Sequence, residues 1–238
     1  MRLETHIHTK YSQDSLLCFW ILYAKCRMKK IDYVAITEHN NVDGAHAFKQ
    51  YCEKRGNKVR VIIGEEIMTD SGEVIGLYLT KQIQQGLSVS DTIEAIHSQN
   101  GIVYIPHPYD EKRKKTVLRE TEIAAHKEQI DYIECHNGRN ISTEYTAKQT
   151  EIAEKYGLTK VVGSDAHTFL ELGRNYMEID IEPCDAEHFR TAIAVARLHK
   201  ANRIKISHTL TKLARVIHLV KRGKWDELYR AIYRAATK

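Results

Sequence analysis

The chain has 238 residues, of which 42% are hydrophobic and 28% are charged, as is typical of an ordinary globular protein. No apolar run approaches the roughly 20 residues that span a bilayer, so the composition argues against a membrane-spanning protein. The net charge of +5 is unevenly distributed. Residues 201–238 hold ten Lys and Arg but two acids, whereas the remainder holds 26 basic and 29 acidic residues.

The five cysteines are odd in number, scattered, and free of any C-x-x-C pair. We therefore expect reduced thiols in a cytoplasmic protein. A cleaved signal peptide is not expected, because its removal would take away His6, the first candidate ligand described below.

Short apolar runs alternate with helical patterns along most of the chain. We expect strands at residues 2–5, 33–37, 59–63, 74–79, 102–105, 130–135, 160–163 and 176–181. We expect helices at 16–29, 42–55, 142–156 and 185–198, one that starts at Ser88, and one within 111–129. About seven strand–helix units whose strands lack clean alternation favour a closed barrel of mainly parallel strands, a distorted (β/α)7-type fold.

Candidate metal ligands follow the expected strands. An isolated H-x-H such as His6-Ile7-His8 is more often two unrelated surface histidines, but here other strand ends supply matching groups. Further histidines and acids in such positions are His39, Glu66, His107, Asp165 and His167. Because the carboxyl ends of barrel strands converge on one rim, we expect one site with too many ligands for a single tetrahedral zinc. This donor set suits two or three divalent ions such as Mn²⁺, Zn²⁺ or Fe²⁺.

These motifs together resemble the PHP (polymerase and histidinol phosphatase) family of metal-dependent phosphoesterases, from about residue 2 to 200. The matching segments are His6-Ile7-His8-Thr9 with Ser12 and Asp14, Ile36-Thr37-Glu38-His39-Asn40, Gly64-Glu65-Glu66, Ile105-Pro106-His107-Pro108, Ile133-Glu134-Cys135-His136-Asn137-Gly138-Arg139, Gly163-Ser164-Asp165-Ala166-His167-Thr168 and Glu171-Leu172-Gly173-Arg174. The resemblance implies the PHP barrel, with domain boundaries at 1–200 and a basic amphipathic helical tail at 201–238. It also implies that the chain hydrolyses a phosphate ester.

The resemblance also assigns roles to residues. His6, His8, Glu66 and Asp165 would form one metal pocket, with Glu66 bridging two ions. His39, His107 and His167 would ligate neighbouring ions, and Asp14 would be the carboxylate of the first motif, although Gln13 places it one residue later than usual.

Two positions depart from the family pattern. Glu38 replaces the usual Asp before His39, where it could still orient an imidazole. Glu73 stands where many members have a ligand histidine, so one ion is either lost or bound by oxygen, which tilts the preference towards Mn²⁺ or Fe²⁺.

A metal-bridged hydroxide is the nucleophile that this chemistry implies, with arginines on the phosphoryl oxygens. Arg139 and Arg174 are the candidates for that contact, each balanced against an ordinary ion pair, and Lys10 is a weaker one. His136 is interpreted as a packing residue, and the tail histidines His208 and His218 receive no catalytic role. The substrate would be a small phosphorylated molecule, such as a nucleotide, sugar or histidinol phosphate, or an oligonucleotide end.

Residues 201–238 are expected to form two helices around Arg222-Gly223-Lys224. A helical hairpin packed on the barrel is the simpler interpretation; contact with nucleic acid or an anionic membrane is the sharper one. For the whole chain, an amidohydrolase and a catalytically degenerate PHP binding or regulatory module remain as alternatives. The sequence does not indicate the oligomeric state.

Overall fold

Nine strands form one sheet within residues 1–236, the part of the chain that the computed structural model describes. The strands are β1 (Arg2–Ile7), β2 (Tyr33–His39), β3 (Arg60–Met68), β4 (Glu73–Leu77), β5 (Ile102–Ile105), β6 (Tyr132–Asn137), β7 (Thr159–Gly163), β8 (Tyr176–Glu178) and β9 (Arg197–His199). Their order in the sheet is β7-β6-β5-β4-β3-β2-β1-β8-β9.

The sheet curls into a nearly closed mixed barrel. The β1–β2–β3 and β5–β6–β7 groups are parallel, whereas β4 runs antiparallel to β3 and β5. On the other side of β1, β8 and β9 add antiparallel strands. Closure comes from the end of β1 and from the residues that follow β1 and β7: Ile7 bridges Ala166, and the His8 amide donates to the Ala166 carbonyl at 2.9 Å. The expected distorted barrel is confirmed, with antiparallel strands interrupting its parallel series.

The β3–β4 hairpin depends on Gly72. This residue has a φ of 130°, and a Cβ placed there would lie 2.4 Å from the Cα of Leu118. Glycine alone therefore fits both the backbone conformation and the close approach of the chain. The turn reverses the direction of the chain, so that Glu73 at the start of β4 lies beside the end of β3.

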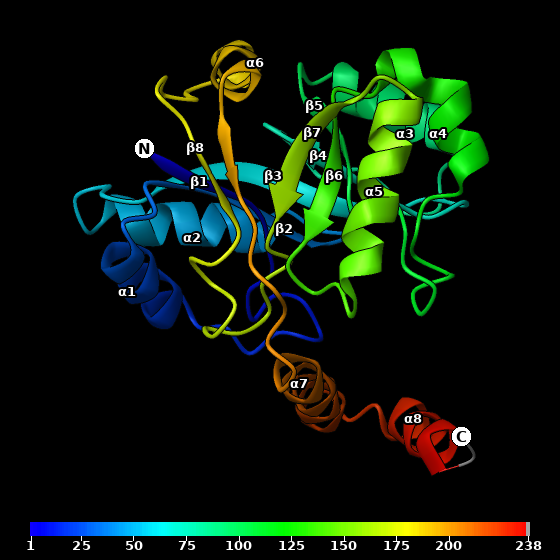
Figure 1. Ribbon diagram of the computed structural model, residues 1–238. Coiled ribbons are helices and arrows are strands. Elements are labelled where there is room, and N and C mark those ends of the chain that lie inside the picture. Colours follow the sequence, from blue (N-terminus) through cyan, green and yellow to red (C-terminus); the bar gives the residue numbers. More distant parts are fainter. Residues whose placement is uncertain (237–238) are drawn as a thin grey trace.

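Within residues 1–236, eight α-helices surround the barrel or extend from it (Figure 1). They are α1 (Phe19–Lys29), α2 (Asp43–Glu53), α3 (Val89–His97), α4 (Glu120–His126), α5 (Thr143–Lys155), α6 (Ala186–Ala194), α7 (Ser207–Lys221) and α8 (Trp225–Ala236), and α4 continues into a 3-10 turn, η1 (Lys127–Gln129). Ser88 caps α3 as expected, since its hydroxyl accepts from the Asp91 amide at 3.1 Å.

The helix expected within 111–129 is present as α4, and one other expected helix is shorter than predicted. Residues 111–119, before α4, form turns in which Asp110 accepts from the Lys112 amide at 2.8 Å and Arg113 donates to Asp165. The helix expected at 185–198 ends at Ala194, and its last residues form the short strand β9, which pairs with β8.

The barrel interior changes character along its axis. At the amino-terminal ends of the parallel strands it is apolar, with Leu3, Tyr33 and Leu77 in one cluster with Phe189 of α6. Farther along the same strand faces, polar side chains replace the apolar ones. On β3, for example, Ile62 is followed two and four residues later by Gly64 and Glu66. The outer strand faces pack against the helices in a second apolar cluster.

A bulge in β1 sets which of its residues face inward. Glu4 pairs with Val34 and Ile7 pairs with Ile36, so β1 carries one extra residue between these pairs. The extra residue shifts the alternation, so that both Leu3 and His6 face the interior while Ile7 packs outward.

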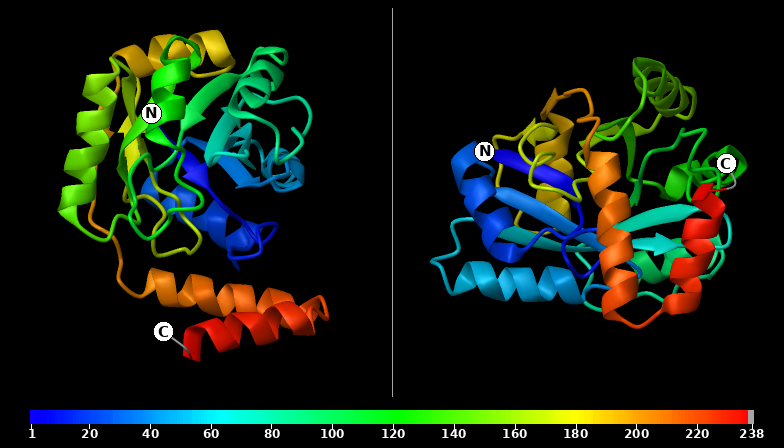
Figure 2. Two further views of the ribbon diagram at one scale, coloured as in Figure 1. Left: turned by 90° about the vertical axis from the view of Figure 1, so that its right-hand side faces the viewer. Right: turned by 90° about the horizontal axis from the view of Figure 1, so that it is seen from below.

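Helices α7 and α8 lie side by side against one end of the barrel, joined by Arg222–Lys224 as expected (Figure 2). Ala214 and Leu219 of α7 are buried, and His218 donates to the Ser15 carbonyl at 3.2 Å. The last two residues of the expected tail lie outside the described residues. Among residues 1–236, no helix is both long enough and apolar enough to cross a membrane.

Candidate metal centre

Glu66 stands at the centre of the polar end of the barrel. Its Oε1 lies 3.3 Å from His6 Nε2 and 3.1 Å from His107 Nε2, and its Oε2 lies 3.3 Å from His8 Nε2 and 3.0 Å from His39 Nδ1. Burial opposes ionisation of this carboxyl, but His6 and His39 outweigh it and hold the pKa of Glu66 well below its usual range. One carboxylate with four imidazoles around it has the arrangement of a ligand that bridges two cations.

His6 and His8 point their ring nitrogens at each other. The two Nε2 atoms are 3.1 Å apart, and Asp165 Oδ1 lies 3.8 Å from the first and 3.6 Å from the second. Burial and the neighbouring His167 and His39 lower the pKa of His8 to about 3, so its ring is neutral and retains a lone pair. Donor nitrogens and oxygens that converge in this way fit a divalent cation.

In the described chain, four groups of three residues have donor atoms that all lie within 4.8 Å of one another, and three of these groups belong to this end of the barrel. They are His6-His8-Glu66, His8-His39-His167 and His39-Glu66-Glu73. The pKa of His6 is raised well above its usual value, because Glu66, Asp165 and Glu134 outweigh the effect of burial. The buried carboxylates therefore require positive charge, which protons or divalent ions can supply, and ligation would release those protons.

Asp14 reaches the centre despite the extra residue in its motif. Its Oδ2 lies 3.2 Å from His167 Nε2 and 3.5 Å from His39 Nε2. Its Oδ1 is buried and makes no hydrogen bond within the described residues. Such an oxygen has a free lone pair with which it could bind a cation.

Glu73 also belongs to the cluster. Its oxygens lie 3.7 Å from His39 Nδ1 and 3.5 Å from His107 Nε2. Burial, followed by the charge of Glu66, raises the pKa of Glu73 to about 7. The departure at this position thus places a carboxylate oxygen where many family members have a histidine nitrogen, in keeping with the second of the two expected alternatives.

Glu134 supports the centre, although no role of its own was assigned to it from the sequence. Its Oε1 accepts from His6 Nδ1 at 2.8 Å and from the Tyr104 hydroxyl at 2.6 Å, while Oε2 accepts from the His107 amide at 2.7 Å. The hydrogen bond from His6 Nδ1 to Glu134 fixes the proton of His6 on Nδ1 and turns Nε2 towards Glu66. A Cβ at Gly163 would lie 1.7 Å from Glu134 Oε1, so glycine is required beside it. The available signal was an isolated Glu within a buried apolar strand.

Glu38 orients His8 indirectly. It accepts from the Thr9 amide at 3.0 Å and from the Ser12 hydroxyl, and Ser12 Oγ in turn lies 3.2 Å from His8 Nδ1. A Cβ at Gly44 would lie 2.3 Å from Glu38 Oε1, so this glycine makes room for the longer side chain. The expectation that Glu38 could orient an imidazole fits this relay through Ser12.

Two arginines approach the centre from loops. Arg113, which sequence reasoning missed, donates to Asp165 Oδ2 at 2.7 Å and pairs with Asp110 at 3.3 Å. The available signal was the run of basic residues at 112–115. Arg139 is buried after β6, where it donates to Thr211 Oγ1 at 2.9 Å and lies 3.8 Å from Glu171.

The other sequence candidates lie elsewhere. Arg174 is exposed, donates to the Asn202 carbonyl at 3.2 Å and does not line the pocket, so the structure does not bring it to the centre. Lys10 lies over the ring of Phe19, and His136 contacts Thr146. His208 of α7, which was given no role, lines the pocket and contacts Arg139 at 3.4 Å.

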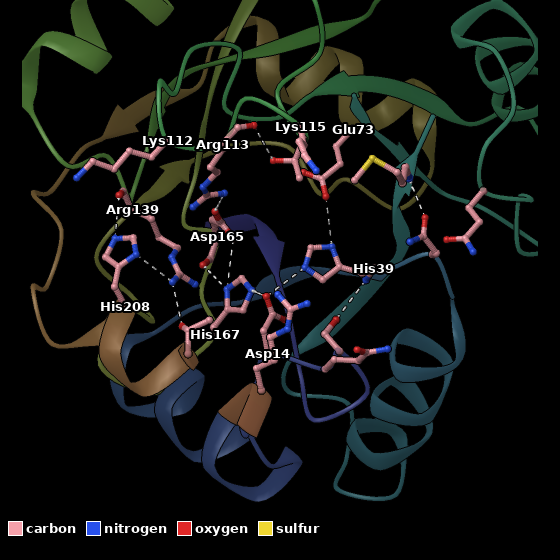
Figure 3. A pocket seen from close by; sticks show the side chains of 18 of the residues that line it. Asp14, His39, Glu73, Lys112, Arg113, Lys115, Arg139, Asp165, His167 and His208 are labelled. Atoms are coloured by element: carbon pink, nitrogen blue, oxygen red, sulfur yellow. Dashed lines mark hydrogen bonds and ion pairs between the residues drawn. The ribbon is translucent and has the colours of Figure 1, made fainter. Parts of the chain in front are cut away.

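The centre opens into a cavity of about 1010 Å³. Figure 3 shows Asp14, His39, Glu73, Asp165 and His167 converging on it, with basic side chains around them. His107 and Asp165 both have positive φ, at 28° and 49°. Non-glycine residues held in that region often mark a functional site.

Comparison with known proteins identifies the family. A model of the PHP domain matches residues 4–237, which includes the tail as well as the barrel. The chain is 33% identical over 193 residues to MJ0417, an uncharacterized protein of Methanocaldococcus jannaschii, covering 78% of this chain and 74% of that one. It is 41% identical over 121 residues to MJ1587 of the same organism, covering 46% and 68%. The chain belongs to the PHP domain family.

Solved structures share the fold at low sequence identity. A two-domain protein from Bacteroides vulgatus, described as containing a predicted PHP-like metal-dependent phosphoesterase, has a TM-score of 0.66 at 17% identity, covering 84% of this chain and 65% of that one. PsfC from Pseudomonas syringae has a TM-score of 0.63 at 16% identity, covering 92% and 98%. A protein from Chromobacterium violaceum described as an amidohydrolase has a TM-score of 0.59 at 16% identity, covering 83% and 98%. The fold alone therefore does not separate these activities.

Proposed function

We propose that this chain is a metal-dependent phosphoesterase that hydrolyses a small phosphorylated substrate. The reaction adds the oxygen of water to phosphorus, breaks the bond from phosphorus to the ester oxygen, and passes a proton to the departing alcohol. The observation that carries this proposal is that His39, Asp165 and His167 of the candidate metal centre line one pocket together with Arg113 and Arg139. An anion-binding group beside a metal site suits a phosphate ester better than a neutral amide.

The residues divide the work between holding cations and binding phosphate. His6, His8, Glu66 and Asp165 would hold one ion, and His39, His107, His167, Asp14 and Glu73 would complete the sites of its neighbours. Divalent ions there would supply Lewis acidity, which lowers the pKa of water and neutralises phosphoryl charge. Glu134 and Ser12 keep the first two imidazoles oriented throughout.

Phosphate oxygens would be bound by the two arginines. The Arg113 guanidinium already touches Asp165, so it lies one side chain away from the proposed ions. The Arg139 Nε is buried without a hydrogen-bond partner among the described residues, and a phosphate oxygen would satisfy it. Arg174 remains a sequence-based candidate for which the arrangement offers no support.

We assign two or three ions, of Mn²⁺, Zn²⁺ or Fe²⁺, to the three overlapping donor groups. The additional carboxylate of Glu73 favours Mn²⁺ or Fe²⁺ over Zn²⁺, because harder ions prefer oxygen. The buried, unpaired thiols of Cys26, Cys52 and Cys135 support a reducing, cytoplasmic setting.

The proposal is tested with p-nitrophenyl phosphate and Mn²⁺. Hydrolysis should fall at least about 100-fold in His8→Ala and in Asp165→Ala, because each removes a ligand of the centre. His188→Ala is the matched control, since that histidine is exposed on α6 and pairs with Asp185. Hydrolysis of amide but not phosphate substrates would favour an amidohydrolase. Metal binding without turnover of any phosphate ester would favour a regulatory module.

A further inference from the structure

The pocket is larger than the scissile phosphate requires. Its volume of about 1010 Å³ is at the upper end of the roughly 300–1,000 Å³ that holds drug-sized ligands. Part of its lining is made of candidate metal ligands. The loop at residues 111–116 and α7 of the tail supply another part, and Figure 3 shows Lys112, Arg113 and Lys115 of the loop and His208 of α7 around Asp165 and His167.

The part of the pocket lining that lies outside the candidate metal centre is strongly cationic. Seven Lys and Arg line the whole pocket against four Asp and Glu. Three of the acids, Asp14, Glu73 and Asp165, belong to the candidate metal centre, and the fourth, Glu111, accepts from the Tyr109 hydroxyl at 2.9 Å. Away from the metal centre, the lining therefore has an excess of positive charge.

Most of these cations have no protein partner. Arg113 and Arg139 are paired with acids, but among residues 1–236 no ion pair engages Lys112, Lys115 or Arg215. Arg222 is likewise without an ion pair in this part of the chain. Like charges gathered around a cavity repel one another, and an anion bound between them would relieve that repulsion.

One face of helix α7 lines the pocket and places its cationic side chains there. His208, Thr211 and Arg215 follow one another at steps of three and four residues, and Arg222 comes seven residues later at the carboxyl end of the helix. Residues at these steps share one helix face. All four line the pocket, and the first two hold Arg139. The exposed Lys212 and Lys221 of the same helix do not line it.

We propose that Arg215 and Arg222 of α7, together with Lys112 and Lys115 of the loop at residues 111–116, form a second phosphate site. The substrate class is then a small molecule with two phosphate groups, one at the metal centre and one between this loop and α7. This inference rests on the proposed function, because that function places the first phosphate. The tail helix thereby becomes part of the substrate pocket.

The test compares α,ω-alkanediol monophosphates with the corresponding bisphosphates, at chain lengths of three to six carbons, using the full chain with Mn²⁺. An alkane spacer offers nothing else to recognise. At low salt, kcat/KM for the best bisphosphate should exceed that for its monophosphate by about tenfold, beyond the factor of two from its two equivalent ends. Raising the ionic strength should reduce this preference.

The variant Arg215→Ala/Arg222→Ala should lose the preference while its kcat on the monophosphate stays unchanged. Lys212→Ala/Lys221→Ala removes the same charge from α7 outside the pocket and should keep the preference. Equal rates on both substrates in the unaltered protein, or equal loss in both double variants, would overturn the second site.

A binding measurement separates this inference from the proposed function. Calorimetry with propane-1,3-diol bisphosphate needs no turnover. If no phosphate ester is hydrolysed but this probe binds the unaltered protein more tightly than Arg215→Ala/Arg222→Ala, the proposed function fails and the second site stands. If the two proteins bind the probe equally, the second site fails.

Discussion

The two ends of the barrel interior are built from the same strands but have opposite chemistry. At the amino-terminal end, Ile62 and Leu77 belong to one apolar cluster with Phe189 of α6. At the carboxyl end, Glu66 and Glu73 on the same strand faces are buried among imidazoles. Apolar packing stabilises the first end, whereas the second confines like charges at a cost in folding free energy. The difference separates the part of the barrel that holds the fold together from the part that binds ligands.

The largest effect on activity is expected from a substitution at the carboxyl end. Glu66→Gln removes the charge that faces His6, His8, His39 and His107. Phosphate release should fall about 10³-fold or more, because several kcal/mol of cation and transition-state stabilisation is lost. Glu111→Gln at the pocket rim should keep its activity, as measured by steady-state kinetics. Full activity in Glu66→Gln would contradict the assignment of Glu66 as the bridging ligand.

At the amino-terminal end the expected effect is on stability. Phe189 is 1% exposed and packs edge-on against Tyr132 with ring centroids 5.5 Å apart. Phe189→Ala should lower the free energy of unfolding by about 3–5 kcal/mol, because it leaves a cavity. Urea denaturation measures this loss, and Phe169→Ala, at a 47% exposed position, should change it little. A large loss of kcat in folded Phe189→Ala would break the division between the two ends.

The pH dependence of stability should reflect the carboxyl of Glu4, which is buried on the outer face of β1. Burial raises its pKa to about 8, although the Gly173 amide and Ser164 partly oppose the rise. The folded protein therefore holds a proton that the unfolded chain releases above its pKa of 4.5. This contribution to stability is complete below pH 4.5 and is lost as the pH rises to about 8.

Between pH 5.5 and 8.5 the unaltered protein should lose up to about 3 kcal/mol of stability relative to Glu4→Gln, which has no such proton to lose. Urea denaturation of both proteins at the two pH values measures the difference. Parallel pH dependence of the two proteins would show that Glu4 ionises normally.

The smallest effect is expected from Glu134, which orients His6 in the candidate metal centre. Glu134→Gln keeps the shape of the side chain but weakens its bond to His6 Nδ1. Metal affinity should fall about 10–100-fold, as for other residues that orient a ligand histidine. Competition with a chelating dye measures the affinity. Glu65→Gln, a buried change whose carboxyl bonds the Ile83 amide, should have a smaller effect; equal losses would assign the effect to burial alone.

The sequence predicted the barrel and most of the centre because both depend on local pattern. Buried strands appear in the sequence as apolar runs, and candidate ligands such as His39 and His167 come directly at or after them. Asp14 could be placed because its motif lies next to β1, and the structure brings it to His167. The family motifs added the ligands that spacing alone left open.

What could not be predicted depends on contacts between distant residues. Glu134 is 128 positions from His6, and Arg113 is 52 from Asp165, so no local pattern connects either pair. The bulge in β1 is equally invisible, since it is defined by its pairing with β2. Contact of the tail with nucleic acid or an anionic membrane stays a prediction.

We propose that the carboxyl end of the barrel holds several metal ions. Elemental analysis of the purified protein after equilibration with Mn²⁺, Zn²⁺ or Fe²⁺ and removal of free metal measures their number. We expect two or three ions per chain, with fewer in Glu66→Gln. Retention of no ion by the unaltered protein, or the same number in both proteins, would contradict it.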